Sequence, residues 1–185
     1  IDGNLLRILH GLFHTRVERI SFDYSSIASD VFDYAIANNL NVGLVGATES
    51  ELDLALQNIK MNHSGLKIVY ARNGYFSSDY EICESINEIN DCNVSLLIVG
   101  MGAPYQEKFL SFVKKSCKNI DLAFSCGGFI TQTAISRDYY YPIVKRLNLM
   151  WLQRVIMHSH VRKRILFDYP IFIVKYISSK LKRIV

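Results

Sequence analysis

Along the middle of the chain, short apolar runs typical of buried strands alternate with longer segments whose apolar residues recur at helical spacing. Four short apolar runs predict strands, at residues 41–46, 66–70, 94–100 and 121–126. The third run, VSLLIVG, is continuously apolar, which is typical of a strand covered on both faces. Between these runs, apolar residues recur every three or four positions, as on one face of a helix.

The predicted helices carry start signals and apolar stripes. Thr48 with Glu51, and Ser78 with Glu81, have the spacing of a capping box, in which two side chains bond the first free N–H groups of a helix. We expect one helix before the first strand, over residues 25–38, and one after each of the first three strands. Their inward-facing residues are predicted to be Ile27, Val31, Tyr34 and Ala35; Leu52, Ala55, Leu56 and Ile59; Tyr80, Cys83, Ile86 and Ile89; and Phe109, Phe112 and Val113.

Strand–helix alternation of this kind predicts an α/β fold: a Rossmann-like parallel sheet with helices on both faces. Ligands of such sheets bind beyond the carboxyl ends of the strands. Three of these ends are turns that contain glycine, where backbone N–H groups can approach a ligand closely. The turns are Gly46-Ala47-Thr48, Gly100-Met101-Gly102 and Gly127-Gly128.

The C-terminal part differs in pattern and in charge. Helical periodicity appears at residues 143–158 and again at 161–185, with a break expected at Pro170. We therefore predict a sheet domain over residues 1–142 and a basic helical appendage over 143–185. From Arg137 onward there are eleven Lys or Arg and two Asp, so this part carries +9 and the rest of the chain −5, within the total of +4. This asymmetry predicts an anionic partner for the appendage.

An anionic membrane surface is the partner that this composition favours. The apolar stretch 165–177 is interrupted by charge and proline and is shorter than the about 20 residues that span a bilayer. Basic residues on and around it suit a segment lying on a membrane face. The alternative is a C-terminal helix docked on the core. An acidic body without a nucleic-acid motif argues against nucleic acid. The predicted membrane-facing cations are Arg162, Lys163, Arg164, Lys175, Lys180, Lys182 and Arg183.

The bulk composition fits an intracellular globular protein. The 185 residues are half apolar, and the four cysteines form no C-x-x-C pair, so we expect reduced thiols. Cys126, beside Gly127, is either a nucleophile or a small buried side chain at the end of a strand. No three residues have metal-ligand spacing, and no metal or other cofactor is predicted.

The most distinctive segment is GMGAPYQEK, residues 100–108, which joins a buried strand to a helix. Gly102 permits a tight turn, and Pro104 stands where a starting helix needs no N–H. Gln106 and Glu107 follow in the first helical turn, at the ligand edge. A Gln amide can pair with a base edge or a sugar hydroxyl, and a Glu can accept from hydroxyls. Plain helix capping is the alternative for Glu107.

A strand followed by G-x-G-x-P-x-Q-E-K resembles the WecG/TagA/CpsF family of bacterial glycosyltransferases. Further segments resemble that family in the same order along nearly the whole chain. They are Asp2-Gly3, the D-G motif; NVGLVGATESELDLALQNI, the strand–helix unit; AFSCGGFI; and RLNLMWLQR.

The resemblance implies an inverting, metal-independent transfer from a UDP-sugar to a sugar carried on undecaprenyl diphosphate, in the synthesis of teichoic acid, capsule or exopolysaccharide. The donor sugar is a hexose or N-acetylhexosamine such as N-acetylmannosamine. It implies a cytoplasmic protein, peripheral on the inner face of the cell membrane, and a homo-oligomer is compatible with it. Asp2 falls on the family's proposed base, and Arg19 is the candidate for the diphosphate, with Arg16 as an alternative alignment. The donor-binding residues are expected to be Gly46, Ala47, Thr48, Gly102, Pro104, Gln106, Glu107, Gly127 and Gly128.

The family has a further segment before its D-G motif, whereas this chain begins at Ile1, so the resemblance implies that the chain lacks the N-terminal part of its sheet domain. Other departures from the family pattern leave two alternatives. The family's G-G-x-F-D lacks its acid at Gly127-Gly128-Phe129-Ile130, and Arg137-Asp138-Tyr139 replaces R-A-P. A non-catalytic subunit that binds a UDP-sugar or a partner transferase therefore stays open. An NAD-linked dehydrogenase is disfavoured, because Gly43 and Gly46 do not form G-x-G-x-x-G.

Overall fold

The protein is described by a computed structural model, which covers residues 4–136, 139, 141–147, 149–157, 162 and 164–181. It divides into two compact units. One, the sheet unit, is Phe22–Tyr139, and the other, the helical unit, joins Ile1–Ser21 with Tyr140–Val185. The N-terminal residues therefore belong with the C-terminal helices rather than with the sheet.

The sheet unit is built on four parallel strands in the order β2-β1-β3-β4. This arrangement confirms the predicted α/β fold with a parallel sheet. Each strand lies within or beside a predicted apolar run. The strands are β1 (Val42–Gly46), β2 (Ile68–Arg72), β3 (Leu96–Gly100) and β4 (Leu122–Ser125).

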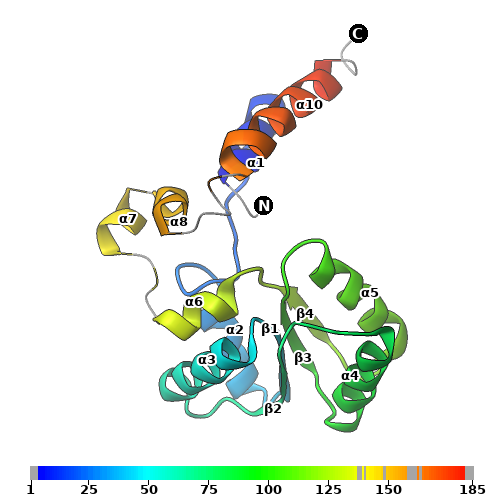
Figure 1. The fold of residues 1–185 in the computed structure, drawn as a ribbon. Coiled ribbons are helices and arrows are strands. Elements are labelled where there is room, and N and C mark those ends of the chain that lie inside the picture. The colour runs from blue at the N-terminus through cyan, green and yellow to red at the C-terminus, as the bar shows by residue number, and fades with distance from the viewer. Residues whose placement is uncertain are drawn as a thin grey trace. The chain divides into compact units, whose positions relative to one another are not determined.

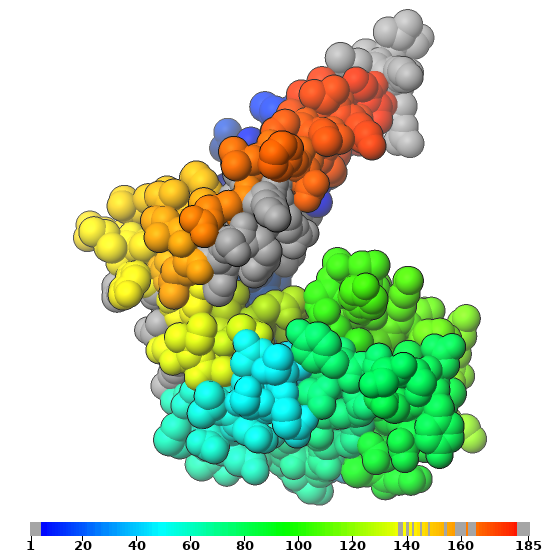
Figure 2. All heavy atoms as spheres, in the orientation of Figure 1, coloured from blue at the N-terminus to red at the C-terminus, as the bar shows by residue number. Residues whose placement is uncertain are grey.

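Helices cover both faces of the sheet (Figure 1). One face carries α2 (Ala28–Ala37), α3 (Glu49–Asn62) and α6 (Phe129–Ile135), and the other carries α4 (Asp79–Asp91) and α5 (Tyr105–Ser116). Helices α3 and α6 lie side by side on their face of the sheet (Figure 1; Figure 2 shows the same orientation with all atoms).

Successive residues of β3 point to opposite faces, and both faces are buried. Leu96 and Ile98 pack with α2, α3 and α6, whereas Leu97 and Val99 pack with α4 and α5. All four are fully buried. This two-sided burial is the physical reason for the continuous apolar run, because neither face of the strand meets water.

Three of the predicted inward side chains are wrong: Tyr34, Tyr80 and Phe112 are 53%, 75% and 48% exposed. Each lies at the margin of its stripe, where a helix packed on a sheet turns away from the contact. The exposed Cys83 is a fourth error of the same kind. The contact on α2 is made instead by Phe32, which is fully buried and was not predicted.

The helical unit contains short helices from both ends of the chain. These are α1 (Asn4–Phe13), α7 (Pro142–Arg146), α8 (Met150–Met157), and a π-helical turn (Arg164–Asp168) that leads into α10 (Tyr169–Leu181). The break expected at Pro170 is this change of helix type. Pro170 is the second residue of α10, directly after the π-helical turn.

The sequence patterns did not predict α1, which contacts α10. The rings of Phe13 and Tyr176 lie 6.1 Å apart, centroid to centroid, and Lys180 Nζ lies 2.8 Å from His14 Nε2. Within the described part of the chain, no helix has both the length and the apolar character needed to cross a membrane.

Candidate active site

The strand order places the topological switch point of the sheet between β1 and β3. The chain leaves β1 toward α3 on one face of the sheet and leaves β3 toward α5 on the other face. The two connecting loops therefore separate at the carboxyl edge, and this is the point where open parallel sheets bind ligands. The loops that border it are residues 46–48 and 100–104, both predicted from the sequence.

The end of β1 is fastened closely to the end of β3. Gly46 has φ +150°, and a Cβ placed there would lie 2.3 Å from the carbonyl oxygen of Gly100, so no side chain fits. The Ala47 N–H donates to that same carbonyl oxygen at 3.3 Å. The predicted residue Gly46 thus allows two strand ends to meet at van der Waals distance.

Thr48 begins α3 with a complete capping box, as predicted. Its N–H donates to the Glu51 carboxylate at 2.9 Å, and its hydroxyl accepts the Glu51 N–H at 3.3 Å. The N–H groups of Ala47 and Thr48 are both bonded within the protein. A ligand at this loop can therefore contact side-chain and α-carbon surfaces of these two residues, but not these donors.

The loop after β3 turns at Gly102, whose φ is +74°. A Cβ at this position would meet nothing within 4 Å, so the glycine is required by backbone conformation and not by crowding. Pro104 stands at the N-cap of α5, and the Lys108 N–H donates to its carbonyl oxygen at 3.2 Å. The predicted helix start is therefore in place.

Gln106 joins the β3 loop to the β4 loop. Its side-chain carbonyl oxygen accepts the Gly127 N–H at 3.2 Å, and its amide nitrogen donates to the Glu107 carboxylate at 2.9 Å. Gln106 is 8% exposed, whereas Glu107 faces solvent. The structure thus brings together three of the predicted ligand residues, and it gives the Gln106 amide protein partners.

The loop after β4 carries Gly127 at φ +54° and Gly128 at the N-cap of α6. Helix α6 is held to α3 by the Asn58 side chain, which donates to the Thr133 carbonyl oxygen at 2.8 Å. Burial raises the pKa of the Cys126 thiol to about 12, so the thiol stays protonated at neutral pH. Cys126 is partly buried and packs against the core beneath α2, α3 and α6, so the structure favours a packing side chain at the end of the strand over a nucleophile.

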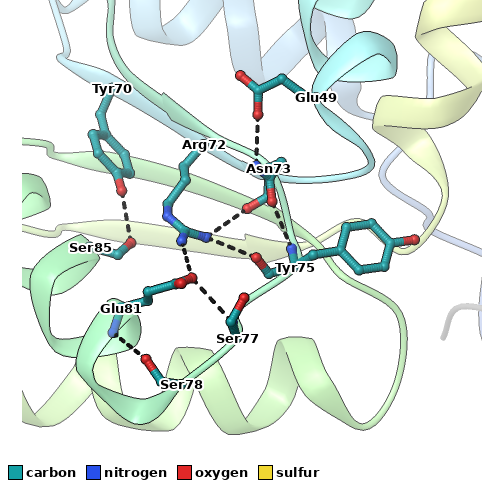
Figure 3. Close-up of polar contacts among 9 residues, drawn as sticks. All are labelled: Glu49, Tyr70, Arg72, Asn73, Tyr75, Ser77, Ser78, Glu81 and Ser85. Carbon is teal, nitrogen blue, oxygen red and sulfur yellow. Dashed lines mark hydrogen bonds and ion pairs between the residues drawn. The ribbon is translucent and has the colours of Figure 1, made fainter.

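A fourth loop at this edge, residues 73–78 after β2, was missed by sequence reasoning (Figure 3). The Arg72 guanidinium pairs with the Glu81 carboxylate at 2.7 Å and donates to the carbonyl oxygens of Asn73 and Tyr75. The Asn73 amide reaches Glu49 at the start of α3, 2.7 Å away. The Asn-Gly pair at 73–74, directly after a predicted strand, was the signal that could have found this turn.

The same network fixes the start of α4. The Glu81 carboxylate accepts the Ser77 N–H, and with the Arg72 pair this lowers the pKa of Glu81. Ser78 caps the helix through the Glu81 N–H, but Glu81 does not return a bond to Ser78, so the predicted capping box is only half formed. The Tyr75 ring points away from Arg72 and Glu81 and is 70% exposed (Figure 3).

Of the two predicted catalytic residues, the structure describes Arg19. Arg19 belongs to the helical unit, where its guanidinium donates to the Ser21 hydroxyl at 2.8 Å. Asp2 lies outside the described residues, as do Lys163, Lys182 and Arg183 among the predicted membrane-facing cations. The side chain of Arg164 is likewise not described, whereas Arg162 and Lys175 are exposed. In the described ranges, no three His, Cys, Asp or Glu side chains converge as a metal site.

A parallel Rossmann-like sheet with glycine turns and a Gln–Glu pair at its carboxyl edge defines the class of α/β proteins that bind nucleotide-type ligands. Comparison with known proteins gives the family. The model of the glycosyl transferase WecG/TagA/CpsF family matches residues 1–184, so the chain belongs to this family and is a glycosyltransferase. This match confirms the family membership that the sequence motifs indicated. It excludes the alternative that the chain is an NAD-linked dehydrogenase.

One relative is similar over the full chain. It is the UDP-Gal:alpha-D-GlcNAc-diphosphoundecaprenol beta-1,4-galactosyltransferase of Shigella boydii, 46% identical over 188 residues. The alignment covers 100% of this chain and 77% of the relative.

Proposed function

We propose that this glycosyltransferase moves a hexose, with galactose as the first donor to test, from a UDP-sugar to a sugar carried on diphosphoundecaprenol. The observation that carries the proposal is the 46% identity, over the whole chain, to a protein named for that donor and that acceptor. The carboxyl edge of the sheet, with the turns at Gly46, Gly102 and Gly127, is the proposed donor site.

The proposed reaction is a single displacement with inversion at the anomeric carbon. The acceptor hydroxyl oxygen forms a bond to that carbon, the carbon–oxygen bond to UDP breaks, and UDP leaves with the bonding electrons. Asp2 takes the hydroxyl proton as general base. Arg19 stabilises the charge that develops on the diphosphate. No residue of the described chain is assigned to a metal, and metal-independent transfer is part of the proposal.

The helical unit is proposed to lie on the cytoplasmic face of the membrane, where a lipid-linked acceptor is found. The π-helical turn and α10 expose Leu166, Phe167, Ile171 and Val174, and Lys175 lies among them. Apolar side chains with cations beside them suit the boundary of an anionic bilayer. The division into a catalytic segment 1–142 and a membrane segment 143–185, like self-association, stays a prediction.

The first experiment is a transfer assay with the purified chain, UDP-galactose and a GlcNAc-diphospholipid acceptor. The expected result is UDP release with formation of the disaccharide lipid, unchanged by a metal chelator. Loss of transfer on chelation would contradict the metal-independent mechanism. Calorimetric titration with UDP separates the alternatives further. A folded chain that binds UDP without transferring any of a panel of UDP-sugars would be the non-catalytic subunit.

Single substitutions test the assigned roles. Asp2→Asn is expected to lower kcat by about 100-fold or more while UDP affinity is kept, because general-base catalysis contributes on that scale. Arg19→Gln is expected to weaken UDP binding, and Arg16→Gln is the matched control. If Arg16→Gln weakens UDP binding and Arg19→Gln does not, the alternative alignment, with Arg16 at the diphosphate, is favoured.

A further inference from the structure

Gln106 was predicted to contact the ligand, but its surroundings describe a different task. The side chain is 8% exposed and lies between two loops of the carboxyl edge. Its oxygen accepts the Gly127 N–H at 3.2 Å and its nitrogen donates to Glu107 at 2.9 Å. The amide keeps one donor and one lone pair, but a side chain with so little exposed surface offers them poorly to a substrate.

We propose that Gln106 is a positioning residue, which fixes the Gly127 turn and aims the exposed Glu107 carboxylate at the donor's hydroxyl groups. This inference rests on the proposed donor site at the carboxyl edge. Glu107 is the group that accepts hydrogen bonds from the donor, and Gln106 acts through it.

The geometry supports this assignment in two ways. Gly127 lies 21 residues from Gln106 and on the loop of a different strand, so the bond couples the ends of β3 and β4. Glu107 is the next residue on an α-helix, where neighbouring side chains point about 100° apart, so a bond between them restricts the Glu107 rotamer. A carboxylate held in one rotamer loses less entropy when it binds a hydroxyl.

The substitution Gln106→Glu keeps the hydrogen bond from Gly127 and removes the hydrogen bond to Glu107. The new carboxylate still accepts the Gly127 N–H, but in place of a donor it presents a second negative charge to Glu107. Two carboxylates at this distance repel, and they share a proton as the pH falls. A shared proton restores a donor between residues 106 and 107.

The test is the pH profile of donor kcat/KM for Gln106→Glu, with the UDP-sugar that the wild type accepts. We expect a loss of about 10-fold to 100-fold at pH 8, the range that misplacement of a catalytic group causes. The ratio to wild type should recover several-fold by pH 6. Gln57→Glu, the same change on the exposed face of α3, is the matched control and should show neither effect. A loss that does not change with pH would overturn the proposal.

A double-mutant cycle gives a second test that does not depend on one variant. Gln106→Met removes both bonds at nearly constant volume, and Glu107→Gln removes the charge that Gln106 orients. If Gln106 acts through Glu107, the loss from Glu107→Gln is much smaller in the Gln106→Met background than in wild type. Equal losses in the two backgrounds would refute the role.

Stability and donor identity are measured separately. A variant that loses activity because it unfolds should show a lower melting temperature as well as a lower rate. Thermal unfolding of each variant at pH 6 and pH 8 measures this. Wild-type transfer from UDP-galactose tests the proposed donor. If the wild type transfers another sugar but not galactose, the proposed donor is wrong. The ratio of kcat/KM between each Gln106 variant and wild type can still be measured with that other donor, so the two proposals are tested independently.

Discussion

The helices of the two units differ in how deeply they bury their apolar side chains. In the sheet unit, Leu52, Ala55 and Ile59 of α3 are buried against the sheet. In the helical unit, Ile171 and Val174 of α10 are 55% and 65% exposed. Helix α3 also exposes Leu54 and Met61, but it has a fully buried face, whereas no described side chain of α10 is buried. A helix that exposes apolar residues beside cations without a buried face suits a contact outside the chain, and the proposed contact is the membrane.

The strongest test of this comparison is a matched pair of truncations. Phe32→Ala in the core of the sheet unit is expected to lower the free energy of unfolding by about 3–5 kcal/mol, because a large cavity is left behind. Ile171→Ala in α10 is expected to change it by less than about 0.5 kcal/mol. Urea denaturation measures both. Equal destabilisation would mean that α10 is packed as a core element.

Within the sheet unit, Gly46→Ala is expected to cost about 3 kcal/mol, because the new Cβ meets the Gly100 carbonyl and the backbone is strained. Gly102→Ala is the control, with a left-handed φ but open space around the Cβ. It should cost about 1 kcal/mol. Chemical denaturation ranks the two. A smaller effect at Gly46 than at Gly102 would show that the ends of β1 and β3 separate readily.

For the helical unit, we expect Arg162→Gln with Lys175→Gln to weaken binding to vesicles that contain anionic lipid by roughly 30-fold, at about 1 kcal/mol per cation. Lys114→Gln with Lys115→Gln, two exposed positions on α5, is the control with the same charge change. Co-sedimentation with anionic and zwitterionic vesicles measures the effect. Equal weakening by both pairs would indicate attraction by net charge alone.

The smallest expected effect is a pH dependence in the loop after β2. The backbone N–H of Ser77 and the Arg72 guanidinium lower the pKa of Glu81 in the folded protein. Its contribution to stability is therefore complete above the unfolded pKa of about 4.3 and is lost as the pH falls through the lower folded value. Glu81→Gln should be less stable than wild type at pH 6, and the difference should shrink by pH 3. Glu84→Gln, an exposed position on the same helix, should show a smaller difference.

The local elements were predictable where one rule governed them. Thr48 and Glu51 cap a helix because both partners lie within one turn, and this spacing is visible in the sequence. The errors at Tyr34, Tyr80 and Phe112 arose where an aromatic residue stood at the margin of a stripe. Periodicity gives the direction of the buried face but not its width, which depends on how the helix packs on the sheet.

The same limit applies to the site. Glycines at 46, 102 and 127 and the Gln106-Glu107 pair were recognisable as candidates from their places after apolar runs. The Arg72–Glu81 pair was not, because nine residues and a turn separate its members. The partner of Gln106 was also hidden, since Gly127 is adjacent only once β4 lies beside β3.

The sequence by itself determined the α/β class, the family and the basic character of the C-terminal segment, because each depends on local period, motif or charge count. The tertiary structure decided which loops meet at the carboxyl edge and that the Gln106 side chain bonds to Gly127 and Glu107. It also decided that α1 lies against α10. The physical reason is that strand order and helix pairing are set by burial of surfaces from distant parts of the chain. No local pattern records which of those surfaces will meet.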